Sequence, residues 1–204
     1  MDQPKHVVKE HHANGQVKQE SWRVDGECHR LDGPAYIQYF PSGQVARKEW
    51  YVNGEYHRLD GPAWVEYHDN GQVAGEYWYV NGVNHRLDGP ASIRYHANGQ
   101  VEYEYWYVNG LNHRLDGPAR VWYHDNGQVA NEFWYYEDQK VTPEFIQQKR
   151  LEQAPALAYI DGVKLVEVGD QYYLIFGNEV EGPVGLEDGL DRLQAMGKVQ
   201  YAKI

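Results

Sequence analysis

The chain carries four copies of the heptapeptide His-Arg-Leu-Asp-Gly-Pro-Ala, whose histidine and aspartate are residue types that bind metal ions. The copies begin at His29, His57, His85 and His113. If each unit adds two strands, equivalent histidines lie roughly 10 Å apart, whereas the ligands of one zinc ion all lie within about 2.2 Å of it. We therefore expect no metal and no cofactor. Each Asp should cap its own turn, and each Arg should pair with a carboxylate of a neighbouring unit such as Glu76 or Glu104.

A row of glutamates at one position of the repeat could also do chemistry. Its members are Glu20, Glu76, Glu104 and Glu132. Two carboxylates act as acid and base in a glycosidase only when their environments differ, and a repeat copies one environment. The lone Cys28 occupies a position that later units fill with Tyr or Asn, and motifs for nucleophilic catalysis or nucleotide binding are absent from the sequence. We therefore expect no enzymatic activity.

The elements that position these residues recur with a period of 28 residues. A fixed period of this size is typical of arrays in which each unit buries its apolar face against its neighbours. In residues 63–90, a strand at 63–68 and a strand at 73–80 flank the turn Asp-Asn-Gly, and a second Asn-Gly turn follows. The sequence thus predicts an array of about five β-hairpin repeats over residues 7–140, forming a single-layer twisted antiparallel sheet.

The composition supports a mainly β protein with an aromatic core, since the chain has 18 Tyr and 7 Trp but only 4 Phe and 2 Met. Three positions are the same in nearly every unit and are predicted to form the core; the alternative is a stacking platform for bases or sugars. They are the valines 17, 45, 73, 101 and 129, the tryptophans 22, 50, 78, 106 and 134, and the tyrosines 39, 67, 95 and 123. The net charge of −11 disfavours direct binding to nucleic acid or to a membrane surface. A protein partner suits it better, although an acidic surface can also mimic nucleic acid.

The positions that vary between units indicate where a partner could bind, because the scaffold dictates little there. Alternation along the first strand of each unit places on one face of the sheet a mixed set that is rich in Trp, Tyr and Arg. Such residues dominate the energetics of protein interfaces. An ordinary half-exposed sheet face is the alternative. The candidate protein-binding residues are Tyr36, Trp64, Glu66, Arg94, Arg120 and Trp122.

The unit pattern, Asn-Gly-Gln-Val, then Glu-x-Trp-Tyr-Val-Asn-Gly, then the heptapeptide, resembles the variant MORN repeats of bacterial antitoxin-like and phage-encoded proteins. The resemblance covers about residues 7–140. It implies a single-layer array of twisted β-hairpins that is used for interaction, and some bacterial members of the class are antitoxins. These units have 28 residues and lack the Tyr-Glu-Gly-x-Trp signature of ordinary MORN units of about 23 residues, so a lipid-binding role does not carry over.

The repeat ends near residue 140, and the remaining chain predicts a small α+β part. Thr142 and Pro143 predict the start of a capping or linker helix within residues 141–154. Residues 155–204 predict a small ββα-like domain, with a meander of three runs over 157–176 and a helical stripe over 186–196. The acidic residues of that helix are a further candidate for protein binding, with a solvated face as the alternative; they are Glu187, Asp188 and Asp191.

Taken together, the sequence predicts a cytoplasmic, non-catalytic protein-binding module. The specific hypothesis is an inhibitor that sequesters a protein target, as an antitoxin, an immunity protein or a phage counter-defence factor would. One alternative is an assembly scaffold that forms homo-oligomers. The other is a ligand-binding or enzymatic C-terminal domain, which a polar pocket around Tyr172, Tyr173 and Glu179 would favour.

Overall fold

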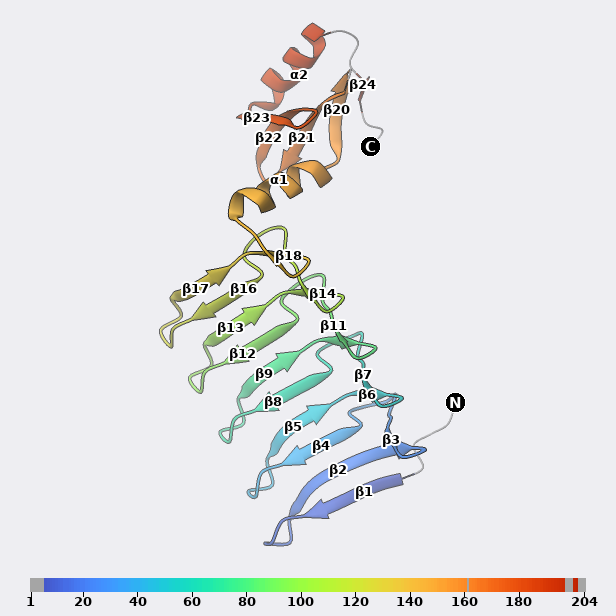
Figure 1. Cartoon of the computed structure of the whole chain (residues 1–204). Coiled ribbons are helices and arrows are strands. Elements are labelled where there is room, and N and C mark those ends of the chain that lie inside the picture. The colour runs from blue at the N-terminus through green and yellow to red at the C-terminus, as the bar shows by residue number, and fades with distance from the viewer. Residues whose placement is uncertain (1–5, 161, 197–199, 202–204) are drawn as a thin grey trace. The chain divides into compact units, whose positions relative to one another are not determined.

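The computed structural model describes residues 6–160, 162–196 and 200–201 (Figure 1). The chain divides into two compact units, residues 1–141 and 142–204. Strands dominate the first unit, and the second unit combines strands with two helices, one of them near the C-terminus. The predicted class, a mainly β tandem array of antiparallel hairpins followed by a small α+β part, is confirmed.

The first unit is built on one long antiparallel sheet whose strands follow the chain order. Each hairpin turns at a glycine with positive φ, as at Gly71 (φ 83°), a conformation that glycine adopts without steric cost. A register shift recurs at one position of every hairpin, for example between Glu66 and Tyr67. The strands are β1 (His6–His11), β2 (Val17–Val24), β4 (Tyr36–Tyr39), β5 (Val45–Glu49), β8 (Trp64–Tyr67), β9 (Val73–Tyr77), β12 (Ser92–Tyr95), β13 (Val101–Tyr105), β16 (Arg120–Tyr123) and β17 (Val129–Phe133).

A row of short hairpins follows one long side of this sheet (Figure 1). Three of them turn at an Asn-Gly pair in which the Asn is left-handed, as at Asn81 (φ 49°), whereas the first turns at Asp25-Gly26 and the last at Glu137-Asp138. The N–H of Gly82 donates to the carbonyl of Tyr56 in the preceding unit at 2.9 Å, so neighbouring units are joined here as well as in the main sheet. The strands are β3 (Glu27–Cys28, paired with β2), β6 (Tyr51–Val52), β7 (Glu55–Tyr56), β10 (Tyr79–Val80), β11 (Val83–Asn84), β14 (Tyr107–Val108), β15 (Leu111–Asn112), β18 (Tyr135–Tyr136) and β19 (Gln139–Lys140).

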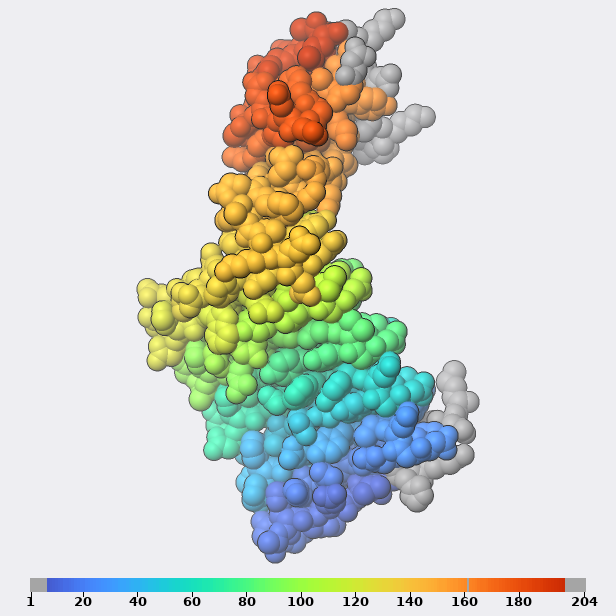
Figure 2. Space-filling view, viewed as in Figure 1, coloured from blue at the N-terminus to red at the C-terminus, as the bar shows by residue number. Residues whose placement is uncertain are grey.

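The core of the array differs from the predicted ladders of Val, Trp and Tyr. Those side chains are half-buried, and Val129 is exposed. The buried apolar side chains are instead small or β-branched, chiefly the last residue of each heptapeptide (Ala35, Ala63, Ala91, Ala119) and the middle of three first strands (Val65, Ile93, Val121). The physical reason is the single layer: within the described residues of the first unit, the main sheet has no second long sheet packed on it that would cover the outer side of a large ring. Successive units form consecutive bands of the array surface in Figure 2.

The second unit is a five-stranded antiparallel sheet with one helix packed on each face. Helix α1 (Pro143–Gln153) begins where predicted, and the Thr142 hydroxyl caps it by accepting from the N–H of Phe145 at 3.3 Å. The meander has four strands rather than three, and its fourth strand was missed because it contains Gly182-Pro183, an unusual pair inside a strand. The order is β23-β22-β21-β20-β24. The elements are β20 (Ala156–Ile160), β21 (Val163–Val168), β22 (Gln171–Phe176), β23 (Glu179–Val184), α2 (Leu186–Met196) and β24 (Gln200–Tyr201).

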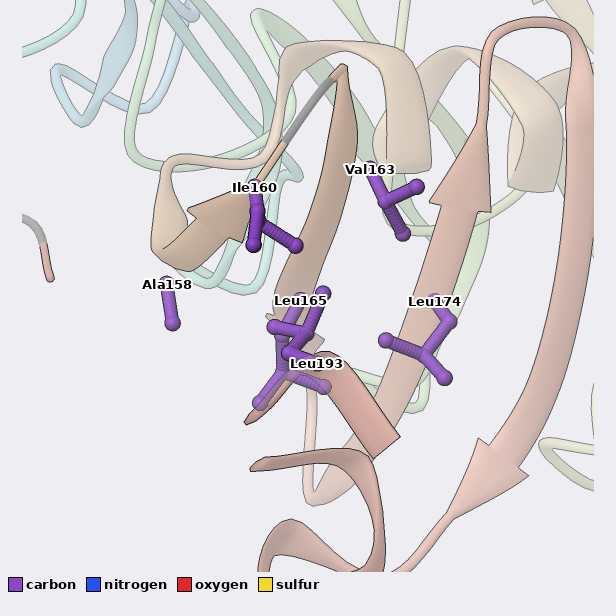
Figure 3. Close-up of a cluster of buried hydrophobic side chains, with 6 residues drawn as sticks. All are labelled: Ala158, Ile160, Val163, Leu165, Leu174 and Leu193. Carbon is purple, nitrogen blue, oxygen red and sulfur yellow. The ribbon is translucent and has the colours of Figure 1, made fainter. Parts of the chain in front are cut away.

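Side chains of β22 alternate between the two cores of this unit. Leu174 joins the cluster under α2, which also contains Leu165 and Leu193 (Figure 3). Tyr173 joins the cluster that contains Leu151 of α1. Helix α1 is therefore built into the second unit, whose limit lies at residue 142 rather than after the helix.

Candidate protein-binding surfaces of the array

The heptapeptide Arg holds its loop in place by stacking on the Trp of its own unit. In the third copy the guanidinium carbon of Arg86 lies 4.1 Å from the ring centroid of Trp78. A Cβ built on Gly89 would lie 2.7 Å from that carbon, so this position has room only for glycine while the guanidinium stays on the ring. The same stacks, at 4.3, 4.2 and 3.8 Å, are made by Arg30 on Trp22, Arg58 on Trp50 and Arg114 on Trp106.

The same Arg pairs with the Asp of its own heptapeptide, which corrects the predicted pairing with Glu76 or Glu104. The Nε of Arg86 lies 2.9 Å from Oδ1 of Asp88, and its Nη1 donates to the carbonyl of Pro90 at 3.3 Å. The sequence could not show this, because the side chain turns back over the Trp ring of its own unit. The hydrogen bond from Arg86 lowers the pKa of Asp88, and Asp32 and Asp60 are lowered in the same way. The aspartates are exposed, so each loop presents its negative charge to solvent while its positive charge faces a Trp ring.

Histidine, proline and alanine of the heptapeptide also have structural roles. The Nδ1 of His85 accepts a hydrogen bond from the backbone N–H of Asn109 in the next unit at 3.0 Å. His29 and His57 do the same with Asn53 and Asn81. The carbonyl of each Pro accepts from the Arg, and each Ala is fully buried, with its backbone paired to the main sheet. Histidine therefore joins neighbouring units.

Leucine is the member of the heptapeptide for which packing gives no role. Leu31, Leu59 and Leu87 are 61%, 79% and 76% exposed, and Leu115 is half-buried. We call Leu31, Leu59 and Leu87 the leucine row. A groove of about 960 Å³ lies between the loops of Leu59 and Leu87. Trp78, Val80 and Val83 line it as well.

An equivalent groove of about 630 Å³ lies one unit earlier, between the loops of Leu31 and Leu59. This surface was not predicted from the sequence, because every member of the heptapeptide can be interpreted as turn or scaffold. The available signal was the strict repetition of a large apolar residue between turn residues, which a turn does not require.

The predicted binding residues of the first strands do lie on one face of the main sheet. Trp64 is opposite both Glu49 and Tyr77 in the register, and Trp122 is opposite Tyr103 and Asn131. The face therefore combines all six candidates with the facing residues of the second strands. We call it the aromatic face. Its candidates are Tyr36, Trp64, Glu66, Arg94, Arg120 and Trp122.

Most of these candidates are engaged within the chain. Trp64 packs against Tyr77, with ring centroids 4.8 Å apart, and stacks with Tyr56 at 5.8 Å. The hydroxyl of Tyr36 donates to Gln19 at 2.8 Å. Glu66 lies opposite Arg47 in the register. These half-buried side chains are supported by their neighbours rather than presented freely.

The first residue of each first strand varies between units, and it varies together with the residue eight positions earlier, which it contacts in three units. Where Trp64 stands, Tyr56 stacks on it. Where Ser92 stands, the amide of Asn84 donates to its hydroxyl at 2.9 Å. In the next unit the Nε of Arg120 donates to Oδ1 of Asn112 at 2.6 Å. Variation between units at these positions is thus matched inside the chain, and it does not by itself indicate a partner.

Arg94 and Trp122 are the exposed candidates of the aromatic face. Trp122 keeps 37% of its surface exposed while contacting Tyr103 and Tyr105, with centroid distances of 5.2 and 5.9 Å. Arg94 lies within 3.2 Å of Glu102. These two residues, like the leucine row, are exposed on the array and can be reached directly by a protein.

The repeated glutamates lie on the opposite face of the sheet, where tyrosines bind them. The hydroxyl of Tyr39 donates to Glu20 at 2.9 Å, and burial together with this hydrogen bond raises the pKa of Tyr39 to about 12. Tyr95 and Tyr123 donate to Glu76 and Glu104 in the same way, at 3.0 and 3.1 Å. Glu20, Glu76 and Glu104 therefore form a structural ladder in which each accepts from a tyrosine hydroxyl, whereas Glu132 of the last unit is exposed.

The candidates of the second unit divide differently. Glu187, Asp188 and Asp191 are exposed on α2, and Asp188 lies 3.9 Å from Arg192, whose guanidinium makes two hydrogen bonds to Glu181. Tyr172 packs with the cluster under α2, whereas Tyr173 is buried on the α1 side. The two tyrosines face opposite sides of the sheet, so they do not line one polar pocket of the kind that would favour a ligand-binding or enzymatic C-terminal domain.

Three further observations bear on a functional site: clusters of metal-binding side chains, helices that could cross a membrane, and similarity to known proteins. Within residues 6–160, 162–196 and 200–201, no three side chains of His, Cys, Asp or Glu gather closely enough to hold a metal ion. Neither helix in the described part of the chain is both long and apolar enough to cross a membrane. Comparison of the sequence with protein-family models and with curated proteins finds no match.

Proposed function

We propose that the array is a non-catalytic protein-binding module that acts by occupying a protein target. The observation that carries this proposal is the leucine row. Exposed leucines recur at one position of the repeat, while every other member of the heptapeptide has a structural partner or is buried. Large apolar side chains that are grouped on a surface are typical of interaction sites.

The specific form of the proposal is an inhibitor that sequesters its target in the cytoplasm, as an antitoxin, an immunity protein or a phage counter-defence factor does. Two features support it. The unit pattern resembles variant MORN repeats, some of which belong to antitoxins. The glutamates and aspartates that could serve acid and base chemistry are held in repeated structural pairs, which suits a binder better than a catalyst.

The test is affinity capture from an extract of the native cell with three forms of the full chain. These are the wild type, the double variant Leu59→Ser with Leu87→Ser, and the control variant Leu157→Ser, which changes an exposed leucine of the second unit. We expect the wild type and the control to retain one protein in a fixed ratio, and the double variant to lose it. Equal capture by all three forms would remove the leucine row from the function.

A second candidate function is an assembly scaffold, which the ends of the main sheet favour. Among the described residues, β1 pairs only with β2 and β17 pairs only with β16, so each has one edge without a strand partner. Val8 on β1 and Val129 on β17 are exposed there. Light scattering after size exclusion tests this alternative: a scaffold should form oligomers that dissociate in the variants Val8→Lys and Val129→Lys.

A further inference from the structure

The leucine row has a regular spacing. Each unit adds two strands to the main sheet, and neighbouring strands lie about 4.8 Å apart, so equivalent loops recur about every 9.6 Å. From Leu31 to Leu87 the row therefore extends over about 19 Å. A partner that contacts every leucine in the same way must repeat its own contacts at this spacing.

The grooves between the leucines combine an apolar lining with exposed carboxylates. Trp78, Val80 and Val83 line the larger groove, and Val83 is partly exposed. Asp60 and Asp88 stand at its sides with their carboxylates exposed, while the arginines that pair with them are largely covered by Trp rings. A complementary partner has apolar side chains facing the groove and cationic side chains beside them.

We propose that the leucine row binds a peptide segment in the polyproline II conformation, with an apolar side chain at every third residue and Lys or Arg nearby. This inference rests on the proposed protein-binding function. A polyproline II helix presents the same edge every three residues and advances about 9.3 Å per turn. It matches the spacing of the array to within about 1 Å over the two intervals of the row.

Other peptide conformations match the row less well. An extended strand presents the same face every two residues, or about 6.7 Å, and so loses register within one unit. An α-helix returns after seven residues, about 10.5 Å, and its apolar stripe drifts by about 20° per heptad. Polyproline II segments also keep their backbone solvated and bind in open grooves lined by aromatic rings, as Trp50 and Trp78 line these.

The test is fluorescence anisotropy with labelled synthetic peptides and the full chain. The probe is four consecutive Leu-Pro-Lys triplets. One control peptide alternates Leu and Lys, and a second replaces each Lys of the probe by Glu. We expect the probe to bind the wild type and the Leu157→Ser variant equally, and the Leu59→Ser, Leu87→Ser variant at least about tenfold more weakly. Both control peptides should also bind the wild type at least about tenfold more weakly than the probe does.

The outcomes separate this inference from the proposed function. Absence of probe binding, equal binding by the alternating peptide, or equal binding to the double leucine variant would each overturn the polyproline II assignment. If one of these occurs while the double variant still loses the captured cellular protein, the leucine row binds protein in another conformation and the proposed function stands. If the double variant captures that protein normally, the proposed function loses its site as well.

Discussion

Because Arg86 stacks on Trp78 directly against Gly89, we expect Gly89→Ala to destabilise the wild-type protein but not a variant that lacks the arginine side chain. Gly89→Ala places a Cβ 2.7 Å from the guanidinium carbon of Arg86 and so displaces that group from Trp78 and Asp88. The stack contributes about 1 kcal/mol, and the hydrogen bond from Arg86 to the carbonyl of Pro90 contributes about 1 kcal/mol more. Against this, alanine at a compatible backbone conformation stabilises by about 0.4–1 kcal/mol through the unfolded state. The net expectation is a loss of about 1 kcal/mol.

The decisive comparison uses Arg86→Ala as the background. With the guanidinium removed, the three closest contacts of the new Cβ disappear, since all three atoms belong to Arg86. Gly89→Ala should then be neutral or stabilise by up to about 1 kcal/mol. The four proteins are the wild type, Gly89→Ala, Arg86→Ala and the double variant. Urea denaturation monitored by circular dichroism gives the free energy of unfolding of each, and Trp fluorescence checks that unfolding is two-state. The four values together give the coupling free energy between Gly89→Ala and Arg86→Ala. Equal destabilisation by Gly89→Ala in both backgrounds would refute the idea that the glycine is there for the arginine.

Four other substitutions test burial, repeat consensus and pH dependence. Trp64→Ala should lower the free energy of unfolding, measured with denaturant, by about 3 kcal/mol, and Trp122→Ala by about half as much, because the ring of Trp122 is the more exposed. Equal losses of stability in the two variants would contradict this ranking. The tyrosines equivalent to Tyr67 donate to a glutamate, as Tyr95 does to Glu76, whereas the Nζ of Lys48 lies 5.8 Å from the ring centroid of Tyr67. Lys48→Glu gives Tyr67 the same carboxylate partner and should raise the melting temperature by about 2 °C. A melting temperature below that of the wild type would count against the ladder. The lowered pKa of Asp88 contributes stability that is present above its ordinary value of 3.8 and lost as pH falls through the folded value. The melting temperature of Asp88→Asn should therefore lie below that of the wild type at neutral pH and converge with it in acid, and a constant difference would argue against the ion pair.

The sequence by itself determined the architecture of the array. Alternation along each strand and the Asn-Gly turns are local signals, and left-handed φ at Asn81 and Gly82 follows from the steric tolerance of those residues. Repetition then fixed the order of the strands, because each hairpin pairs with the next one along the chain. Helix α1 was predictable for the same reason, since Thr142 and Pro143 act on the first turn alone.

Only the tertiary structure decided which repeated residues hold the array together and which face outward. Arg86 pairs with Asp88 because its side chain turns back over a ring eight residues earlier, and the neighbouring-unit carboxylates were equally plausible from spacing. Variation at Ser92 is matched by Asn84 across eight residues, which no local pattern reveals. Leu87 is exposed because no other layer of secondary structure in the described part of the first unit covers its loop. Whether a second layer forms is decided by the assembled sheet and cannot be seen in any one segment of the sequence. Local steric preference fixed the turns, whereas the direction and burial of side chains were fixed by contacts between units.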